Sequence, residues 1–595
     1  MGDLGIGGSF EFVDRKVIIR LKDRGCETPE ELLCSPLFRE VVLRYVRKLK
    51  RNDSPVLAFF GEGCAIGEVD VDELIQVLEL LARMPLDWVA KLLEDQDRRR
   101  FVEHPASLHA FVEGLYDFWR EFERFIVCDS EGDVLDRRPY RTFHATSESL
   151  MHLVRGTYRD IQNHLSARHL DIYRQVRAGA EVAAIALPKP LALPEGCYDK
   201  LRDIPVIRQV LLYPPLLLNP PMNKRTGSFV RVEQNPLELV DIECGEWLCY
   251  PARVGRLLVL ACFHEKFFEL GFSLCNLFEL ADNASLQQPA DAIFLFGAPE
   301  NSLDGLAGLP TVFYDDTANG MLVGAVPRRN EFGYFGYLKK MVLTLHNIKI
   351  MKMGWLPYHG AMIRLRLKGD HDANILILGD TGTGKSETLE AFRNLGGEQI
   401  REMVIIADDM GALELAASGE VLGYGTEVGA FVRLDDLQPG YAFGQLDRAI
   451  IMNPNQVNAR VVLPVTRYDD VVHGYPVDMV LYANNYEEVD DDHPIIERFT
   501  DPATALKLFR EGTAMSKGTT TSTGLVHTYF ANIFGPVQYK SLHDAIAGRY
   551  FEHFYQRGIF VGQLRTRLGI AGWERKGPEE AAHALLDLLQ ANSCR

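Results

Sequence analysis

Apolar residues recur at helical spacing through the first third of the chain. In residues 71–95 they lie three or four positions apart, at Leu74, Val77, Leu78, Leu81 and Met84. Residues 101–125 show the same spacing with many aromatic side chains, and such a stripe is typical of the core-facing side of a helix. We therefore expect a helical N-terminal domain over residues 1–195, whose role the pattern does not define.

Short apolar runs replace the helical spacing after a proline-containing stretch at residues 191–205. These runs occupy residues 207–213, 257–263 and 292–296. Pro and Gly residues separate them, which is typical of strands joined by turns. We expect a mixed-sheet α/β middle domain over residues 196–324, which is a possible substrate-binding part. Residues 325–595 form the third predicted domain, and amphipathic spacing predicts a helix near its end, over residues 578–590.

Length and charge restrict the class of protein. A chain of 595 residues is longer than one hydrophobic core usually supports. The formal net charge of −18 argues against a nucleic-acid partner, because a polyanion would be repelled. No apolar stretch is long enough to predict a membrane span. Ten cysteines without a C-x-x-C pair favour reduced thiols in a cytoplasmic protein.

A glycine-rich segment satisfies the phosphate-binding pattern G-x-x-x-x-G-K-[ST]. It consists of Gly379, Asp380, Thr381, Gly382, Thr383, Gly384, Lys385 and Ser386, followed by Glu387. The apolar run 373–378 predicts a strand before it, and residues 387–392 predict the start of a helix after it. Strand, loop and helix in this order bind nucleotide phosphates, because loop N–H groups and the helix N-terminus face the anion. We expect Lys385 to reach the outer phosphates and Ser386 to hold a divalent cation.

Two adjacent carboxylates follow a second apolar run. Residues 403–407 read as a buried strand and are followed by Asp408 and Asp409. Open α/β sheets bind their ligands at the carboxyl ends of strands. One of these carboxylates is suited to binding Mg²⁺ or Mn²⁺, and the other to orienting a nucleophile or the first carboxylate.

Further segments accompany the phosphate loop in a fixed order. They are Tyr334–Lys340, Pro357–Ala361, Ala407–Asp409, Val421–Leu434, Asn458–Val465, Thr513–Thr519 and Tyr529–Gly535. These segments resemble, in the same order, those of the phosphoenolpyruvate carboxykinase family and in particular its ATP-dependent branch, where the counterparts include Y-A-G-E-M-K-K, M-H-C-S-A, G-D-D and N-T-R-V-V-Y-P-I. The resemblance implies an α/β fold with a carboxykinase-like P-loop nucleotide-binding domain.

The resemblance also implies roles for single residues. Tyr334 would contact the substrate, and Arg460 would stabilise the transferred phosphoryl group. Lys340 in its neutral form, His359 and Asp409 would ligate a metal, and this set suits Mn²⁺ better than Mg²⁺. The implied reaction converts oxaloacetate and ATP to phosphoenolpyruvate, ADP and CO₂, with ATP favoured over GTP or pyrophosphate as the donor.

Several positions depart from the carboxykinase pattern and keep two alternatives open. Glu387 replaces the family's usual Thr, and Gly-Lys-Ser-Glu followed by Ala-Asp-Asp is similar to the HPr kinase family. That similarity implies a kinase of a protein hydroxyl or a small metabolite, with Asp408 as general base. Met515 stands at the family's lid lysine, and only the segment Asn223–Ser228 resembles the one that carries the substrate-binding arginine. The large helical region favours the other alternative, a nucleotide-binding regulatory scaffold.

Overall fold

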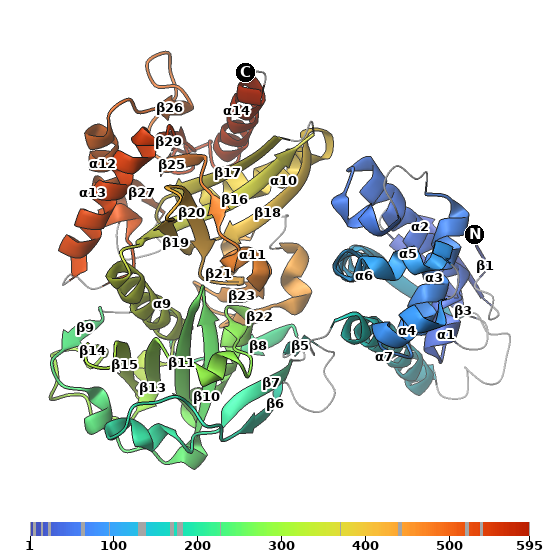
Figure 1. Cartoon of the computed structure of the whole chain (residues 1–595), viewed down its shortest axis with the longest axis horizontal. Coiled ribbons are helices and arrows are strands. Elements are labelled where there is room, and N and C mark those ends of the chain that lie inside the picture. The colour runs from blue at the N-terminus through green and yellow to red at the C-terminus, as the bar shows by residue number, and fades with distance from the viewer. Residues whose placement is uncertain are drawn as a thin grey trace. The chain divides into compact units, whose positions relative to one another are not determined.

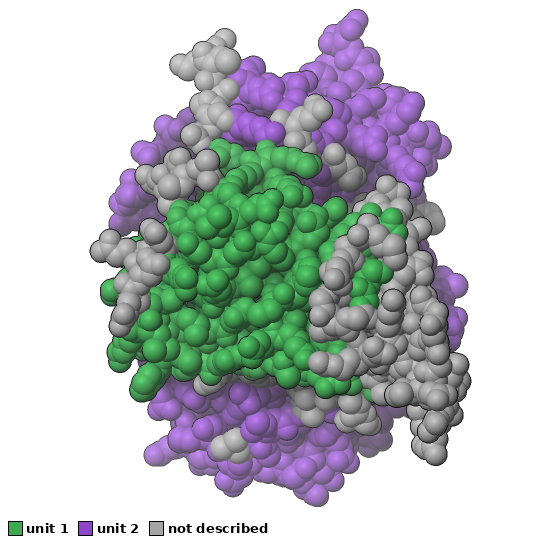
Figure 2. Space-filling model, turned by 90° about the vertical axis from the view of Figure 1, so that its right-hand side faces the viewer, with its two compact units in different colours: residues 1–170 green, residues 171–595 purple. Residues whose placement is uncertain are grey.

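The computed structural model divides the chain into two compact units, residues 1–170 and 171–595, which Figure 2 colours separately. The structure describes residues 2–3, 8–13, 16–21, 25–60, 66–93, 96–128, 139–166, 172–174, 182–212, 214–225, 228–368, 371–437, 443–517, 523–535 and 539–593. Helices and several sheets with both parallel and antiparallel strands make it a mixed α/β protein, as the sequence predicts (Figure 1). Within the described residues, no helix combines the length and apolar character needed to cross a membrane.

The first unit is mainly helical. Its helices are α1 (Pro29–Leu33), α2 (Pro36–Arg51), α3 (Glu68–Leu81), α4 (Leu86–Leu92), α5 (Gln96–Glu103), α6 (Pro105–Arg120) and α7 (Pro139–Leu165). The side chains of Thr28 and Ser35 accept backbone N–H bonds at the starts of α1 and α2, and each is followed by a proline that is pre-organised for the first helical position. Of the apolar positions predicted in residues 71–95, Leu74, Val77, Leu78 and Leu81 lie on α3, whereas Met84 follows that helix and α4 begins only after Pro85.

A sheet that the helical prediction omitted belongs to the same unit. Its strands are β1 (Gly2–Asp3), β2 (Gly8–Val13), β3 (Lys16–Leu21) and β4 (Glu123–Cys128), in that order. The first three form antiparallel pairs, whereas β4 joins β3 in parallel from more than a hundred residues away. Local periodicity does not reveal such a long-range pairing.

The second unit contains two large sheets. The first comprises β5 (Ile172–Arg174), β6 (Val182–Leu187), β7 (Val206–Leu212), β9 (Val230–Val232), β10 (Trp247–Val254), β11 (Leu257–His264), β12 (Glu279–Leu280), β13 (Ala292–Ala298), β14 (Val312–Asp316) and β15 (Met321–Pro327). Strands β11 and β13 are buried along their whole length, which explains why they read as continuous apolar runs. The short apolar runs predicted in this region are therefore strands, as expected.

The second large sheet carries the phosphate loop. It comprises β16 (Leu356–Leu367), β17 (His371–Leu378), β18 (Ile400–Ala407), β19 (Met410–Leu415), β20 (Val421–Gly425), β24 (Tyr475–Pro476), β25 (Met479–Asn484), β26 (Ile496–Arg498) and β29 (Phe560–Arg565). Strand β17 lies inside this sheet, antiparallel to β16 and parallel to β25.

Two smaller sheets and the remaining helices complete the second unit. The sheets are β8 (Leu216–Leu218) with β21 (Gly429–Arg433), β22 (Ile450–Met452) and β23 (Arg460–Pro464), and the hairpin β27 (Thr513–Lys517) with β28 (Thr523–His527). The helices are α8 (Phe268–Phe272), α9 (Phe335–Lys352), α10 (Lys385–Gln399), α11 (Tyr468–Val472), α12 (Pro502–Glu511), α13 (Lys540–Gln556) and α14 (Lys576–Ser593). The predicted C-terminal helix is part of α14.

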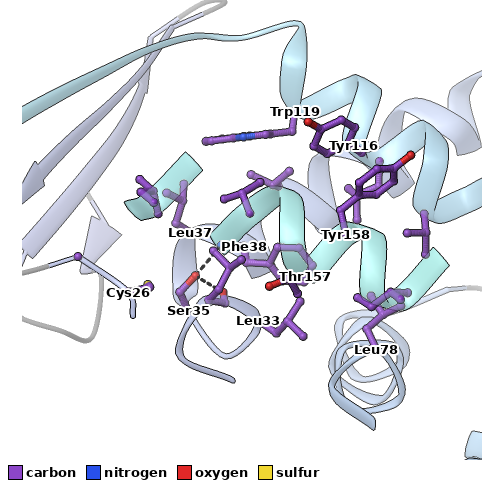
Figure 3. A pocket seen from close by; sticks show the side chains of 18 of the residues that line it. Cys26, Leu33, Ser35, Leu37, Phe38, Leu78, Tyr116, Trp119, Thr157 and Tyr158 are labelled. Carbon is purple, nitrogen blue, oxygen red and sulfur yellow. Dashed lines mark hydrogen bonds between the residues drawn. The ribbon is translucent and has the colours of Figure 1, made fainter. Parts of the chain in front are cut away.

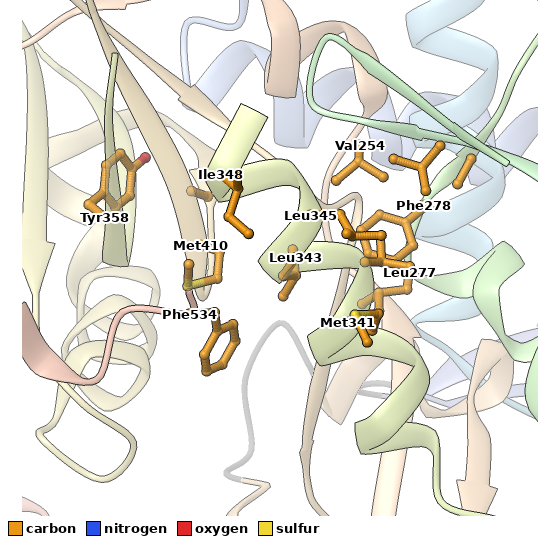
Figure 4. Close-up of a cluster of buried hydrophobic side chains, with 14 of the residues drawn as sticks. Val254, Leu277, Phe278, Met341, Leu343, Leu345, Ile348, Tyr358, Met410 and Phe534 are labelled. Carbon is orange, nitrogen blue, oxygen red and sulfur yellow. The ribbon is translucent and has the colours of Figure 1, made fainter. Parts of the chain in front are cut away.

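Helix α9 lies between the two large sheets and is buried on nearly all sides. Figure 4 shows Met341 and Leu345 of this helix beside Leu277 and Phe278, while Ile348 lies toward Met410. Each large apolar side chain buried in this way contributes about 1.5–3 kcal/mol relative to exposure. The packing fixes α9 in place, and α9 in turn positions the residues at its N-terminal end.

Candidate active site

The phosphate loop has the predicted strand–loop–helix arrangement. Strand β17 ends at Leu378 and helix α10 begins at Lys385. Gly384, the residue before the helix, adopts a left-handed conformation with φ of +93°. A Cβ at this position would lie 2.7 Å from the side chain of Thr566. Glycine is therefore required here both by the backbone conformation and by the close neighbour.

Hydrogen bonds hold the loop and its lysine. The Lys385 ammonium group donates to the carbonyl oxygens of Gly379 at 2.6 Å and Asp380 at 3.0 Å. The Thr566 hydroxyl donates to the Thr383 carbonyl at 2.6 Å. Lys385 is buried within the loop, whereas Ser386 and Glu387 are half-buried in the first turn of α10. These contacts define the shape of the loop.

Strand β16 brings His359 between the phosphate loop and the aspartate pair. Strands β17 and β18 both run antiparallel to β16, so their carboxyl ends meet the beginning of that strand. The Gly379 N–H donates to the His359 carbonyl at 3.1 Å, and the Gly360 N–H donates to the Asp409 carbonyl at 2.9 Å. The sheet register thus explains why residues far apart in sequence are adjacent here.

A network of charged side chains, most of them buried, is centred on the half-buried Asp409. His359 Nε2 lies 2.9 Å from one carboxylate oxygen of Asp409, and Lys339 Nζ lies 2.9 Å from the other. Lys339 Nζ also lies 3.0 Å from a carboxylate oxygen of Glu427. The side chains of Lys339 and Glu427 are only 3% and 4% exposed, so these charges depend on one another rather than on water.

The network shifts the protonation of its members. Burial would raise the pKa of the Asp409 carboxyl, but Lys339 and His359 hold that pKa well below its ordinary value. Burial would lower the pKa of Lys339, but Asp409 and Glu427 raise it. Burial raises the pKa of Glu427 to about 7 despite the opposing effect of Lys339. The cluster therefore contains a fixed carboxylate, a fixed ammonium and a carboxyl that changes charge near neutral pH.

A strained turn orients His359. The Nδ1–H group of His359 donates to the Ala531 carbonyl oxygen. Phe530, Ala531 and Asn532 have φ values of 45°, 55° and 63°, which non-glycine residues rarely adopt. Strained backbone of this kind concentrates at functional sites. Because the Ala531 carbonyl can only accept, Nδ1 carries a hydrogen, and Nε2 is the ring nitrogen that faces Asp409.

Lys340 occupies a different position from its neighbour. Its ammonium group lies 4.8 Å from the centre of the Phe534 ring. Burial, reinforced by the charge of Arg225, lowers the pKa of Lys340 to about 8 although Asp409 acts in the opposite direction. The lysine that contacts Asp409 is therefore Lys339, while Lys340, the predicted ligand, lies in the same electrostatic environment with an amine that loses its proton easily.

The donor atoms near Asp409 fit a divalent cation only with help from another ligand. Among the described residues, no group of three or more His, Cys, Asp and Glu side chains is arranged to hold a metal. Two ligand atoms about 2.1 Å from one cation and at a right angle are about 3 Å apart, close to the 2.9 Å between His359 Nε2 and Asp409. The pair is thus compatible with one shared cation, with a neutral lysine nitrogen as a further ligand.

Two arginines from distant segments approach this cluster. The Arg460 guanidinium is within hydrogen-bonding reach of the buried Tyr334 hydroxyl and lies 5.6 Å from the centre of the Phe431 ring. The charge of Arg225 acts on Tyr334, Tyr337 and Lys340, and burial lowers the pKa of Arg225. The segment that the sequence matched to the carboxykinase arginine therefore contributes a cation to this site, although its Thr226 and Gly227 lie outside the described residues.

Backbone pairing explains how Arg225 reaches Arg460. Strand β8 pairs with β22 in parallel, with Leu218 opposite Met452. Beyond this pair, the Asn223 amide donates to the Val457 carbonyl at 2.8 Å, and the Asn458 amide donates to the Asn223 carbonyl at 2.6 Å. The two loops are thus fixed to each other directly before the two arginines.

Sequence reasoning missed Lys339, Glu427 and Asn485. The Asn485 amide donates to the carbonyl oxygens of Gly382 at 2.9 Å and Met515 at 3.0 Å, so it joins the phosphate loop to β27. The predicted lid begins with this strand, and its Gly518 and Thr519 lie outside the described residues. Lys339 was visible only as the first lysine of a pair, Glu427 only as a member of the matched segment Val421–Leu434, and Asn485 carried no local signal. Asp408, the other predicted carboxylate, is buried and acts with Asp409 to raise the pKa of Glu427.

No family model and no curated protein matches this chain.

Proposed function

We propose that this protein catalyses nucleotide- and divalent-metal-dependent phosphoryl transfer, in a carboxykinase-like reaction that converts oxaloacetate and ATP to phosphoenolpyruvate, ADP and CO₂. The fold of residues 325–595 would then be a carboxykinase-like P-loop domain. One observation carries the proposal. Arg225, Tyr334 and Arg460, from three distant segments, gather with Lys340 beside the His359–Asp409 pair, and this cluster adjoins the phosphate loop through β16.

The cationic side of the cluster suits a small dicarboxylate. Arg225 and Lys340 are both half-buried, and desolvation lowers the pKa of each. Cations with little contact to water favour an anionic ligand, because the ligand charge compensates for their desolvation. In this proposal Arg225 binds a substrate carboxylate, and Tyr334 positions it through its hydroxyl.

The metal site would be formed by His359, Asp409 and a neutral lysine nitrogen, with Ser386 contacting the cation of the nucleotide. A divalent cation bound there would supply Lewis-acid stabilisation of a negatively charged oxygen. The lowered pKa of Lys340 favours its neutral, ligating form. The strained turn at Ala531 keeps the coordinating nitrogen of His359 turned toward Asp409.

The chemistry of the proposed reaction proceeds in two stages. The carbon–carbon bond that holds the departing carboxylate of oxaloacetate breaks, and CO₂ leaves. The electron pair of that bond forms an enolate, whose oxygen carries the negative charge. That oxygen attacks the γ-phosphorus of ATP as the bond to ADP breaks. Lys385 and Arg460 would spread the negative charge of the transferred group. Closure of the β27–β28 hairpin over the site would exclude water, which would otherwise protonate the enolate.

Formation of phosphoenolpyruvate by the purified chain tests the proposal. The assay supplies oxaloacetate and ATP with Mn²⁺, and separately with Mg²⁺, and measures phosphoenolpyruvate and ADP. We expect both products in equal amounts, with greater activity in Mn²⁺. Clear ATP binding without phosphoenolpyruvate formation would rule out the carboxykinase reaction.

Glu427 favours one alternative, a kinase of a hydroxyl group. Its carboxyl has a pKa of about 7 and lies in the same cluster, which is the value expected of a general base at neutral pH. Asp408 was the residue that the sequence predicted for this role. A screen for γ-phosphate transfer to protein hydroxyls and small alcohols distinguishes this kinase, which would label an acceptor without any release of CO₂.

A further inference from the structure

The first unit contains a partly open cavity of about 120 Å³ between its helices (Figure 3). The lining comes from α2, α3, α6 and α7 together with β3 and the α1 region. Every lining residue belongs to residues 19–161, so the cavity is separate from the phosphate loop and from the cluster around Asp409.

The wall of the cavity is almost entirely hydrocarbon. Leu33, Val41, Leu78 and Leu115 are buried apolar members of the lining. Folded proteins contain few voids larger than a water molecule, and apolar voids remain dry. An engineered apolar cavity of about 150 Å³ binds benzene, so a cavity of about 120 Å³ has room for a ring or a short chain of similar size.

Aromatic side chains form a flat part of this wall. The rings of Tyr116 and Tyr158 are stacked, with centres 4.1 Å apart and planes at 10°, and Trp119 lies nearby (Figure 3). The Tyr158 hydroxyl has a hydrogen-bond partner within the protein, because it donates to a carboxylate oxygen of Glu113 at 2.6 Å. The exposed faces and edges of such rings favour planar or aliphatic ligands.

One polar group of the wall lacks a partner. Thr157 is 3% exposed, and its hydroxyl has no hydrogen-bond partner within the described part of the chain. The Ser35 hydroxyl, by contrast, donates to the Leu32 carbonyl at 2.7 Å and accepts from the Phe38 N–H. A buried hydroxyl without a partner is costly. Threonine in a helix populates two χ1 rotamers, so its oxygen can turn to meet a ligand.

We propose that the cavity is a binding site for a small apolar molecule that carries one hydroxyl or carbonyl group, with that group hydrogen-bonded to Thr157. The apolar part of the ligand fills the space between Leu33, Leu115 and the stacked tyrosines. The site is independent of the proposed phosphoryl transfer and gives the helical unit a ligand-binding role.

Binding of two probes of nearly equal shape to the full-length chain tests this proposal. Benzyl alcohol has a ring and one hydroxyl, and toluene lacks the hydroxyl. Isothermal titration calorimetry should show saturable binding of both to the wild-type chain at one site. Because a buried hydrogen bond contributes about 1 kcal/mol net, benzyl alcohol should bind about five- to tenfold more tightly than toluene.

Three variants on α7 make the test specific. Thr157→Val should remove the preference for benzyl alcohol while toluene still binds, and Thr157→Ser should keep the preference. Val154→Phe should fill the cavity and weaken the binding of both probes at least tenfold. Circular dichroism shows whether each variant folds. Failure of the wild type to bind either probe saturably would overturn the proposal. Equal affinity of the two probes, or an unchanged preference in Thr157→Val, would overturn the role of Thr157.

Discussion

Two ion pairs, one from each unit, differ sharply in their exposure to water. In the first unit, the ion pair between Arg39 and Asp72 joins side chains that are 35% and 46% exposed. In the second unit, Lys339 and Glu427 face each other with exposures of 3% and 4%. Exposed pairs contribute about 0–1 kcal/mol to stability, whereas a buried pair must offset a large desolvation cost. Charges kept in such a place indicate chemistry more often than stability.

Burial of charge alone is not sufficient for this interpretation. Arg565, also in the second unit, is 1% exposed and is surrounded by Glu487 and Glu497 at 2.8 Å and 2.7 Å. Its charge is matched by two carboxylates at the end of β29, a structural role. The cluster around Asp409 differs because it combines a histidine, two lysines and two nearby arginines with a phosphate loop. The cluster around Asp409 is therefore distinguished from the Arg565 ion pairs by the variety of its charged side chains and not by their burial.

The largest expected effect is the loss of phosphoryl transfer in Lys385→Ala. In the proposed reaction, Lys385 spreads the negative charge of the transferred phosphoryl group, so we expect its removal to lower kcat about 10³-fold or more. The matched control is Lys507→Ala, since Lys507 is 76% exposed on α12 and its loss should leave kcat unchanged. Near-normal turnover by Lys385→Ala would remove the phosphate loop from the mechanism.

Arg225→Lys should have a smaller and more selective effect. A lysine keeps the charge but loses the planar, bidentate contact with a carboxylate, so kcat/KM for oxaloacetate should fall about 10²-fold. The KM for ATP should change little, because the nucleotide is proposed to bind at the phosphate loop rather than at Arg225. Lys224→Ala, which alters the exposed neighbour, is the control. An equal fall in kcat/KM for oxaloacetate and for ATP would contradict a role of Arg225 in carboxylate binding.

The second unit should also lose stability on mild acidification. Burial lowers the pKa values of His346 and His543 from 6.5 to about 4. Both are neutral in the folded state, while the unfolded chain gains protons below pH 6.5, so stability is full above pH 6.5 and falls as pH drops toward 4. Between pH 7 and pH 5 each histidine should cost about 2 kcal/mol. Urea unfolding of wild type and His346→Gln measures this, and an identical pH dependence in both would contradict it.

The smallest effect concerns the first unit. Thr157→Val replaces a buried hydroxyl that has no partner within the described residues with a methyl group of similar size. We expect the free energy of unfolding of the ligand-free unit to rise by about 1 kcal/mol, because the desolvation cost of the hydroxyl disappears. Hydrogen exchange of residues 105–165 in the full-length chain measures the change, with Thr157→Ser as the control. A loss of protection in Thr157→Val would indicate that the hydroxyl has a partner.

The sequence by itself determined the local features of this protein. Residues 379–384 form a loop between a strand and a helix because glycine conformations and the apolar run before them are properties of adjacent residues. The position of Asp408 and Asp409 after β18 was predictable for the same reason. Helices α3, α6 and α14 and the buried strands β11 and β13 followed from their apolar patterns, although the β1–β4 sheet did not.

Only the tertiary structure decided which side chains meet. Lys339 rather than Lys340 contacts Asp409 because consecutive residues of a helix point in directions about 100° apart, and the packing of α9 chooses between them. Arg225 lies near Tyr334 because β8 pairs with β22, which follows it by more than two hundred residues. The hydrogen bonds within a helix or a turn depend on the residues of that segment alone. The pairing of strands and side chains from distant segments depends on how the whole core packs.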